Sequence, residues 1–134
     1  MATKVLDSWA LVAFLEDEPA AEAVEKLLAQ AAAEKHKLLL SVVNWGEIYY
    51  NTKREVSQEA AEQKARDIAA LPIDIVGVGE DLALARQAAI YKATHRLAYA
   101  DCFAAALAKM KNAELLTGDP EFKALEKEIK INWL

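Results

Sequence analysis

The sequence predicts a single α/β domain with a mainly parallel central sheet of about five strands and helices on both faces of that sheet. Short apolar segments of strand length alternate with longer helical segments from one end of the chain to the other, as in βαβ units. Parallel sheets of this kind are covered by helices on both faces. No Pro-, Gly- or Ser-rich linker and no internal repeat divides the 134 residues, so one domain is expected over residues 1–134.

The first part of the chain predicts one strand followed by two helices. Lys4–Asp7 forms a short apolar segment that ends at a carboxylate, and Ser8–Leu15 follows as an apolar helix with Asp7 or Ser8 as its N-cap. The acidic segment that ends at Pro19 breaks this helix. A second helix is expected over residues 20–35, where apolar residues recur at helical spacing and the charged residues form a solvated face.

The middle of the chain predicts a strand, two helices and another strand. Leu38–Val43 is a second buried strand, and the helix that follows it carries Glu47 in its first turn. Ser57 is the expected N-cap of the next helix, which ends at Leu71 because Pro72 disfavours a helical residue before it. Residues 73–78 form the third strand.

The last part of the chain predicts three helices and two strands. A helix is expected from Gly79 to about Ala93, with acidic residues in its first turn. The segment 97–108 is apolar on all sides except at Asp101, which is typical of a buried helix. Residues 114–117 and 129–134 are the remaining strands, and a helix begins between them at residues 118–120.

Composition and charge narrow the function classes. Hydrophobic residues make up 54% and charged residues 28% of the chain, which is typical of a soluble globular protein. No apolar run approaches the ~20 residues that span a bilayer, and Asp7 interrupts any signal-peptide segment, so a cytoplasmic protein is expected. The single cysteine, Cys102, is expected in the core. A net charge of −5 argues against a broad basic surface for nucleic acid, but is compatible with an acidic pocket that binds divalent cations.

Four carboxylates follow strands or lie in apolar surroundings. Asp7 and Asp119 come directly after predicted strands, Glu47 follows its strand by a few residues, and Asp101 interrupts the buried helix. Each has a simpler structural explanation, since Asp7 and Asp119 could be N-caps and Asp101 could lie in a first helical turn. Together, however, they are expected at the carboxyl ends of parallel strands, where ligands bind. Mutual repulsion among them would be relieved by Mg²⁺ or Mn²⁺, the hard cations that prefer oxygen ligands.

Four segments resemble the acidic motifs of PIN-domain nucleases, and more narrowly those of the VapC-type ribonuclease toxins of toxin–antitoxin pairs. These segments are Val5–Ser8, Ser41–Tyr49, Leu97–Ala108 and Leu115–Phe122. The resemblance covers nearly the whole chain. It implies that the family's four metal-site acids are Asp7, Glu47, Asp101 and Asp119, and that its small polar supporting residues are Ser8 and Thr117.

The expected activity is cleavage of RNA phosphodiesters that depends on Mg²⁺, with Mn²⁺ interchangeable, at this four-carboxylate site. Asp7 and Asp101 are the first choices for direct metal ligands. Lys53, Arg54 and Arg96 are candidate contacts to the RNA backbone, although residues of this kind are more often solvated surface charges. The resemblance also implies a cognate antitoxin protein as a partner, and a homodimer.

Two other readings stay open. A PIN-like module could retain the acids and bind RNA or protein without cleavage. An aspartyl phosphotransfer enzyme would also place an Asp at the end of the first strand, but the haloacid-dehalogenase pattern requires a second Asp at the position of Trp9. A dinucleotide-binding site is poorly supported, because Gly77 and Gly79 lack the third glycine of that motif at Leu82.

Overall fold

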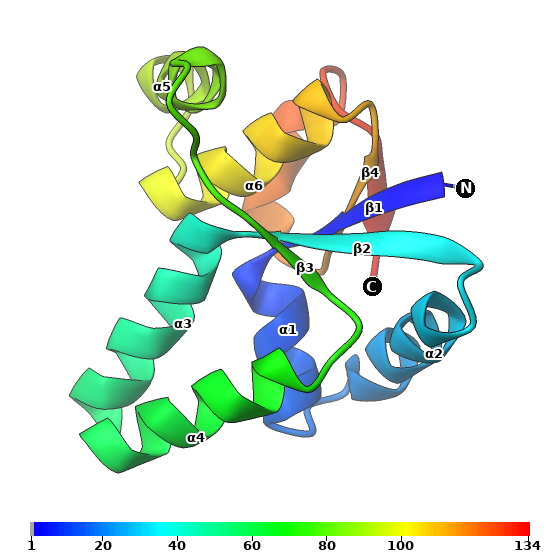
Figure 1. Ribbon diagram of the computed structural model, residues 1–134. Helices are drawn as coiled ribbons and strands as arrows, with labels where there is room; N and C mark the ends of the chain where they lie inside the picture. Colours follow the sequence, from blue (N-terminus) through cyan, green and yellow to red (C-terminus); the bar gives the residue numbers. More distant parts are fainter. Residues whose placement is uncertain (1) are drawn as a thin grey trace.

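A computed structural model describes residues 2–134 as a five-stranded, fully parallel sheet with helices on both of its faces (Figure 1). The strand order is β3-β2-β1-β4-β5, and every neighbouring pair is parallel. The strands are β1 (Ala2–Leu6), β2 (His36–Ser41), β3 (Asp74–Val76), β4 (Glu114–Thr117) and β5 (Ile131–Trp133). The prediction of the fold class is therefore confirmed.

Six α-helices and one short 3-10 helix connect these strands. They are α1 (Ser8–Leu15), α2 (Ala21–Ala32), α3 (Val42–Glu55), α4 (Gln58–Ala69), α5 (Ala83–Thr94), α6 (Tyr99–Met110) and η1 (Pro120–Leu125). The consecutive helices α3 and α4 contact each other and form a V-shaped pair that extends from one side of the sheet (Figure 1). Within the described chain, no helix has the length and apolar character needed to cross a membrane.

The sheet divides the core into two layers, because successive side chains of a strand point to opposite faces. In β1, Val5 packs with α5, α6 and η1, whereas its neighbour Leu6 packs with α1, α2 and residues of α3 and α4. The same division separates Leu115 from Leu116 in β4. Helices thus cover both faces of the sheet. The edge at which the strands end is instead lined by side chains from the loops and from the first turns of the helices.

The order of the strands reverses between β1 and β4. From β1 the chain moves outward to β2 and β3, and then returns to the other side of β1 to form β4 and β5. Ligands of open α/β sheets bind at the carboxyl ends of the strands on either side of such a reversal. The residues that follow β1 and β4, Asp7 and Gly118–Asp119, lie at this position.

The boundaries of α3 differ from the prediction. Val42 and Val43 were expected to end a strand, but they are the first residues of α3. The reason is a cap, since the Ser41 hydroxyl accepts a hydrogen bond from the Val43 N–H at 3.2 Å and overrides the strand preference of two β-branched residues. Glu47 consequently lies in the second turn of α3, whereas the prediction placed it in the first turn.

One other helix start and the type of one helix also differ from the prediction. The helix α5 begins at Ala83 rather than Gly79, with Leu82 as its N-cap residue, and the Asp81 side chain accepts a hydrogen bond from the Ala83 N–H at 3.1 Å in the turn before the helix. The acidic residues therefore precede the first turn. The helix after Asp119 is a 3-10 helix, which returns the chain to β5 within a few residues. The predicted caps Asp7 and Ser57 are both present.

Candidate active site

The structure brings acidic side chains from four elements to the edge where β1 and β4 end. Asp7 follows β1, Asp119 follows β4, Asp101 lies in the first turn of α6, and Glu47 lies in α3. Glu47, Asp101 and Asp119 line one cleft, while Asp7 is buried behind them and within electrostatic range of Asp101 and Asp119. All four acids predicted from the sequence therefore meet at one place.

Asp7 is fully buried and has both carboxylate oxygens in hydrogen bonds. Oδ1 accepts a hydrogen bond from the Ala10 N–H at 2.8 Å, and this bond makes Asp7 the N-cap of α1. Oδ2 accepts a hydrogen bond from the Thr117 hydroxyl at 2.5 Å. The pKa of Asp7 is raised to about 7, mainly by burial and to a smaller extent by the charges of Asp101 and Asp119, while the two hydrogen bonds lower it. The cap and the site role are thus compatible for the same carboxylate.

Asp101 is half-buried at the start of the apolar helix α6. Burial, and after it the neighbouring charges of Glu47, Asp119 and Glu121, raise the pKa of Asp101 to about 7. The first-turn position predicted as the simpler explanation is correct, but the free N–H groups there do not offset the surrounding negative charge. The carboxylates of the site therefore outnumber the positively charged side chains beside them.

Two hydroxyl residues connect the acids to the framework. The Thr117 hydroxyl donates to Asp7 and accepts from the Asp119 N–H at 3.0 Å, so it joins the end of β1 to the loop after β4. The Ser8 hydroxyl accepts from the Asn44 side-chain amide at 3.1 Å and donates to the Asn44 carbonyl at 3.4 Å. Both residues predicted as supporting positions therefore contact the elements that hold the carboxylates.

Asn44 was not predicted as a site residue, although it holds three of these elements together. Its side chain is completely buried, and its amide nitrogen donates to the Ser8 hydroxyl and to the Ala100 carbonyl, each at 3.1 Å. Asn44 belongs to the helix that carries Glu47, Ser8 follows Asp7, and Ala100 precedes Asp101. The available sequence indication was a polar residue between two valines and a tryptophan in an apolar segment.

Glu121 is a second residue of the site that the sequence analysis did not predict. Carboxylate oxygens of Asp101, Asp119 and Glu121 all lie within 4.8 Å of one another, which is close enough for one cation to contact the three. Asp7 and Glu47 are outside this tighter group. Asp119 caps η1 by accepting from the Glu121 N–H at 3.0 Å, and this turn brings the second carboxylate back toward the first. The spacing of two residues at a helix start was the indication in the sequence.

One buried oxygen of Glu47 has no hydrogen-bond donor among the described residues. Glu47 Oε1 is inaccessible to solvent, and a buried acceptor without a partner costs about 1–3 kcal/mol. A cation held against this oxygen would remove that cost. The atoms of the site that could bind a metal are all carboxylate oxygens, and oxygen ligands suit a hard divalent cation such as Mg²⁺ or Mn²⁺.

The cleft has a volume of about 630 Å³ and extends from the acids along the groove between α1 and α3. Its walls include Trp9 and Val12 from α1 and Ile48 from α3. Its charged lining residues are Glu16, Glu18, Glu47, Glu55, Lys64, Asp101 and Asp119. The single cation among them, Lys64, is already paired with Glu16. The cleft is therefore strongly acidic.

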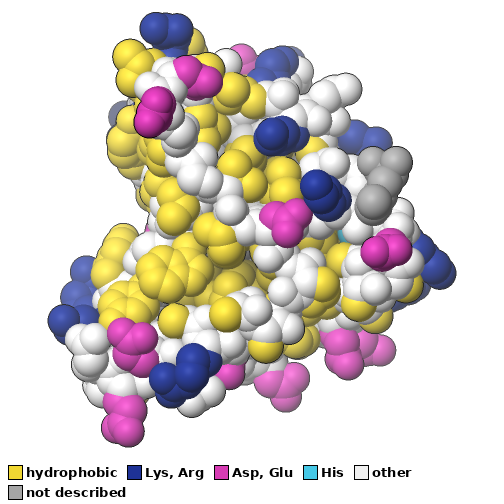
Figure 2. All heavy atoms as spheres, viewed as in Figure 1, with side chains coloured by type: hydrophobic (Ala, Val, Ile, Leu, Met, Phe, Trp, Pro, Cys, Tyr) yellow, Lys and Arg dark blue, Asp and Glu magenta, His cyan; other side chains and the backbone are white. Residues whose placement is uncertain are grey.

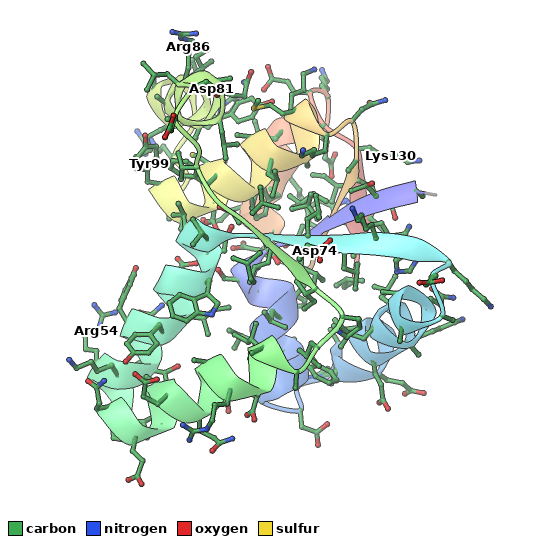
Figure 3. All side chains as sticks on the ribbon, viewed as in Figure 1. Arg54, Asp74, Asp81, Arg86, Tyr99 and Lys130 are labelled. Carbon is green, nitrogen blue, oxygen red and sulfur yellow. The ribbon has the colours of Figure 1, made fainter. Side chains whose placement is uncertain are left out.

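The cations predicted as RNA contacts lie outside this cleft. Arg54 donates to the Asn51 side chain at 2.7 Å and lies over the ring of Tyr50, and Figure 3 shows it pointing outward from α3. Lys53 is exposed on the same helix. Arg96 lines a separate hollow whose wall includes Glu121.

A family model and curated relatives match the chain over most of its length. The model of the PIN domain matches residues 4–128. Ribonuclease VapC30 of Mycobacterium tuberculosis is 32% identical over 124 residues, which cover 89% of this chain and 92% of that protein. A VapC ribonuclease of Mycobacterium bovis shows the same identity and coverage.

Solved structures show the same fold at low sequence identity. The VapBC structure from Salmonella typhimurium, which is bound to DNA, matches with a TM-score of 0.75 at 14% identity and covers 98% of both chains. VapBC2 from Rickettsia felis, bound to a fragment of promoter DNA, matches with a TM-score of 0.71 at 15% identity and covers 97% of both chains. VapC20 of Mycobacterium tuberculosis matches with a TM-score of 0.68 at 17% identity over 90% of this chain and 93% of that one.

Proposed function

The chain belongs to the PIN-domain family, and from this premise we propose that it is a Mg²⁺- or Mn²⁺-dependent endoribonuclease, the toxin of a type II toxin–antitoxin pair. The observation that carries the proposal is the convergence of Asp7, Glu47, Asp101 and Asp119 at the reversal point of the sheet, with too little positive charge to balance them. The likeness to VapC ribonucleases supports RNA as the substrate. The same role implies a cytoplasmic protein.

In this proposal Asp101, Asp119 and Glu47 hold the cation from the walls of the cleft, and Glu121 adds a fourth carboxylate beside them. Asp7 contributes from behind, in an orientation that Ala10 and Thr117 fix. When bound, the cation supplies Lewis-acid chemistry, since it lowers the pKa of a coordinated water and stabilises negative charge on the phosphate.

The chain's own residues orient the reactants and hold protons. With a pKa near 7, Asp7 and Asp101 each lose a proton when a cation binds, and neither needs a strong base to do so. A carboxylate of the cleft that accepts a hydrogen bond from the attacking water would align it with the phosphate, and Glu47, which lines the cleft beside Asp101 and Asp119, is suited to that position. The wall formed by α1 and α3 limits water on one side of the acids.

The acidic cleft also suits the proposed antitoxin. A protein segment with apolar side chains and a basic residue would contact Val12 and Ile48 and neutralise the carboxylates at the same time. An occupant of this kind would block the cation site directly. Structural neighbours of the chain include a toxin–antitoxin complex from Klebsiella pneumoniae, with a TM-score of 0.65 at 16% identity.

We include a homodimer in the proposal. Figure 2 shows hydrophobic side chains gathered on the face between α5 and the α3–α4 pair. Large apolar residues exposed on α3, α5 and α6 include Tyr50, Ile90 and Tyr99, each with about half of its surface accessible. Exposed apolar patches mark protein interfaces. Light scattering of wild type and Ile90→Glu tests this part, with a monomeric variant expected.

The experiment that tests the activity compares metal-free protein before and after addition of Mg²⁺ or Mn²⁺. A labelled structured RNA is incubated with wild type, Asp101→Asn and the surface control Glu25→Gln, whose side chain is exposed on α2. We expect cleavage by wild type and control only when metal is added, and none by Asp101→Asn. Metal binding without cleavage of any RNA would favour the non-cleaving binding module. Transfer of phosphate to Asp7 from a phosphate donor would favour aspartyl phosphotransfer.

A further inference from the structure

We propose that Trp9 is a stacking platform for a nucleobase of the RNA, next to the phosphate that is cleaved. The inference rests on the proposed ribonuclease function and adds a base-binding subsite to it. Trp9 is the second residue of α1, two positions after Asp7, and its side chain is 38% exposed. It lines the same cleft as Asp101 and Asp119, so a base that contacts the indole lies beside the carboxylates.

The backbone of Gly118 holds one face of the indole in place. A Cβ atom at Gly118 would lie 2.1 Å from Cη2 of Trp9, and 2.5 and 2.6 Å from Cζ3 and Cζ2, the two carbons bonded to it. Such nearly equal distances place the Cβ above the ring face, because an approach along the ring edge would put the flanking carbons much farther away than Cη2. The absence of a side chain at residue 118 thus allows the ring to lie flat on the loop that leads to Asp119.

The charges of the cleft favour an uncharged contact with RNA. Six acids and one lysine line it, and that lysine is paired with Glu16, so additional backbone phosphates would be repelled there. A nucleobase carries no charge and presents a π-face, and aromatic side chains bind any base by stacking. Affinity in this part of the site therefore has to come from the bound cation and from apolar or aromatic surface.

Trp9 is the only aromatic residue that lines this cleft in the described chain. The other exposed or half-buried aromatic side chains do not line the cleft: Tyr50 lies under Arg54, and Tyr99 packs edge-on against Phe103. Trp45 and Tyr49 stack on each other at a centroid distance of 5.4 Å on the α3 face that packs against α4, and Trp133 lies in the edge strand β5. A base next to the scissile phosphate therefore has one aromatic partner available.

The first test combines protein variants with RNA lacking a single base. A short RNA that carries the mapped cleavage site is prepared with an abasic nucleotide at each position in turn, and kcat and KM are measured for wild type, Trp9→Leu and Trp9→Phe. Removal of the stacked base should reduce kcat/KM of wild type by about 5- to 150-fold, and Trp9→Leu should cause a similar loss on intact RNA. On the abasic RNA, Trp9→Leu should cause almost no further loss, while Trp9→Phe should recover most of the activity on intact RNA.

A second readout does not depend on cleavage. Asp101→Asn protein binds RNA with 2-aminopurine at the position identified above, and stacking on Trp9 should quench its fluorescence. The quenching should disappear in the double variant Asp101→Asn/Trp9→Leu.

Several results would overturn the inference. One is full wild-type activity of Trp9→Leu, and another is a loss of activity in Trp9→Leu with abasic RNA still reducing its rate as much as that of wild type. Quenching that survives in the double variant would contradict the platform equally. In each of these results the wild-type nuclease still cleaves RNA, so the proposed function stands. If wild type neither cleaves nor binds any RNA with metal present, the proposed function and the platform both fail.

Discussion

Replacing Asp101 by asparagine should stabilise the metal-free protein at pH 8, although most substitutions at half-buried positions destabilise. Asp101 has no hydrogen bond among the described residues that asparagine would lose, and it faces the charges of Glu47, Asp119 and Glu121. Asparagine has nearly the same shape as the protonated carboxyl group. The substitution therefore removes repulsion without leaving a cavity.

The magnitude follows from the pKa. A carboxyl group with a pKa of about 7 in the folded protein and 3.8 in the unfolded chain binds its proton more tightly when folded. Its destabilising contribution thus develops as the pH rises from about 4 and is complete above about 7. The upper limit at pH 8 is about 4 kcal/mol, and screening by the solvent that reaches this half-buried group reduces it to about 1–2 kcal/mol. For a domain of this size that corresponds to about 3–10 °C in Tm.

The assay is thermal unfolding followed by circular dichroism, in chelator, at pH 5.5 and pH 8. We expect Asp101→Asn to unfold at a higher temperature than wild type at pH 8, and by about half as much at pH 5.5, because about half of the destabilising contribution has developed at that pH. Glu25→Gln, an exposed acid on α2, should match wild type at both values. Adding Mn²⁺ should raise the Tm of wild type and have little effect on Asp101→Asn. If Asp101→Asn instead unfolds at a lower temperature than wild type, and the difference is the same at pH 8 and pH 5.5, the reasoning is refuted.

Three further predictions concern the residues around Asp101. Asn44→Ala should lower the free energy of unfolding by about 2–4 kcal/mol, measured by urea denaturation, because two buried hydrogen bonds are lost and a cavity is created; a loss below 1 kcal/mol would contradict the bridging role. Thr117→Val should raise the pH midpoint of Mn²⁺ binding, measured by calorimetry, because the hydroxyl lowers the pKa of Asp7, whereas Thr117→Ser should leave it unchanged. Metal-dependent cleavage should decline as the pH falls below about 7, since protonated Asp7 and Asp101 compete with the cation; a rate independent of pH between 5.5 and 8 would argue against this.

The sequence predicts the fold and the meeting of the four acids because both depend on local patterns. Strand-length apolar segments, caps such as Asp7 and Ser57, and the position of acids after strands are readable without tertiary information. They are sufficient to place Asp7 and Asp119 at one sheet edge once the strands are taken as parallel.

What could not be predicted depends on contacts between distant parts of the chain. Asn44 contacts Ser8 and Ala100, which are 36 and 56 residues away, and no local pattern distinguishes it from an ordinary polar residue of a helix. The face-on packing of Trp9 against Gly118 is of the same kind. The error in the predicted start of α3 has a different cause. The strand preference of two valines and the capping by one serine differ little in energy, and local sequence does not show which one prevails.

The parallel strands have a consequence for the handling of the protein. Because β5 runs in the same direction as β1 and β4, its last residues lie at the edge that carries the acids, and the Leu134 N–H donates to the Thr117 carbonyl at 2.9 Å. The beginning of β1 lies at the opposite edge. A polyhistidine tag appended after Leu134 would start about two strand spacings, roughly 10 Å, from the end of β1 and would add metal ligands beside the site. Purification tags and fluorescent labels for metal-binding or RNA-binding measurements are therefore better attached before β1.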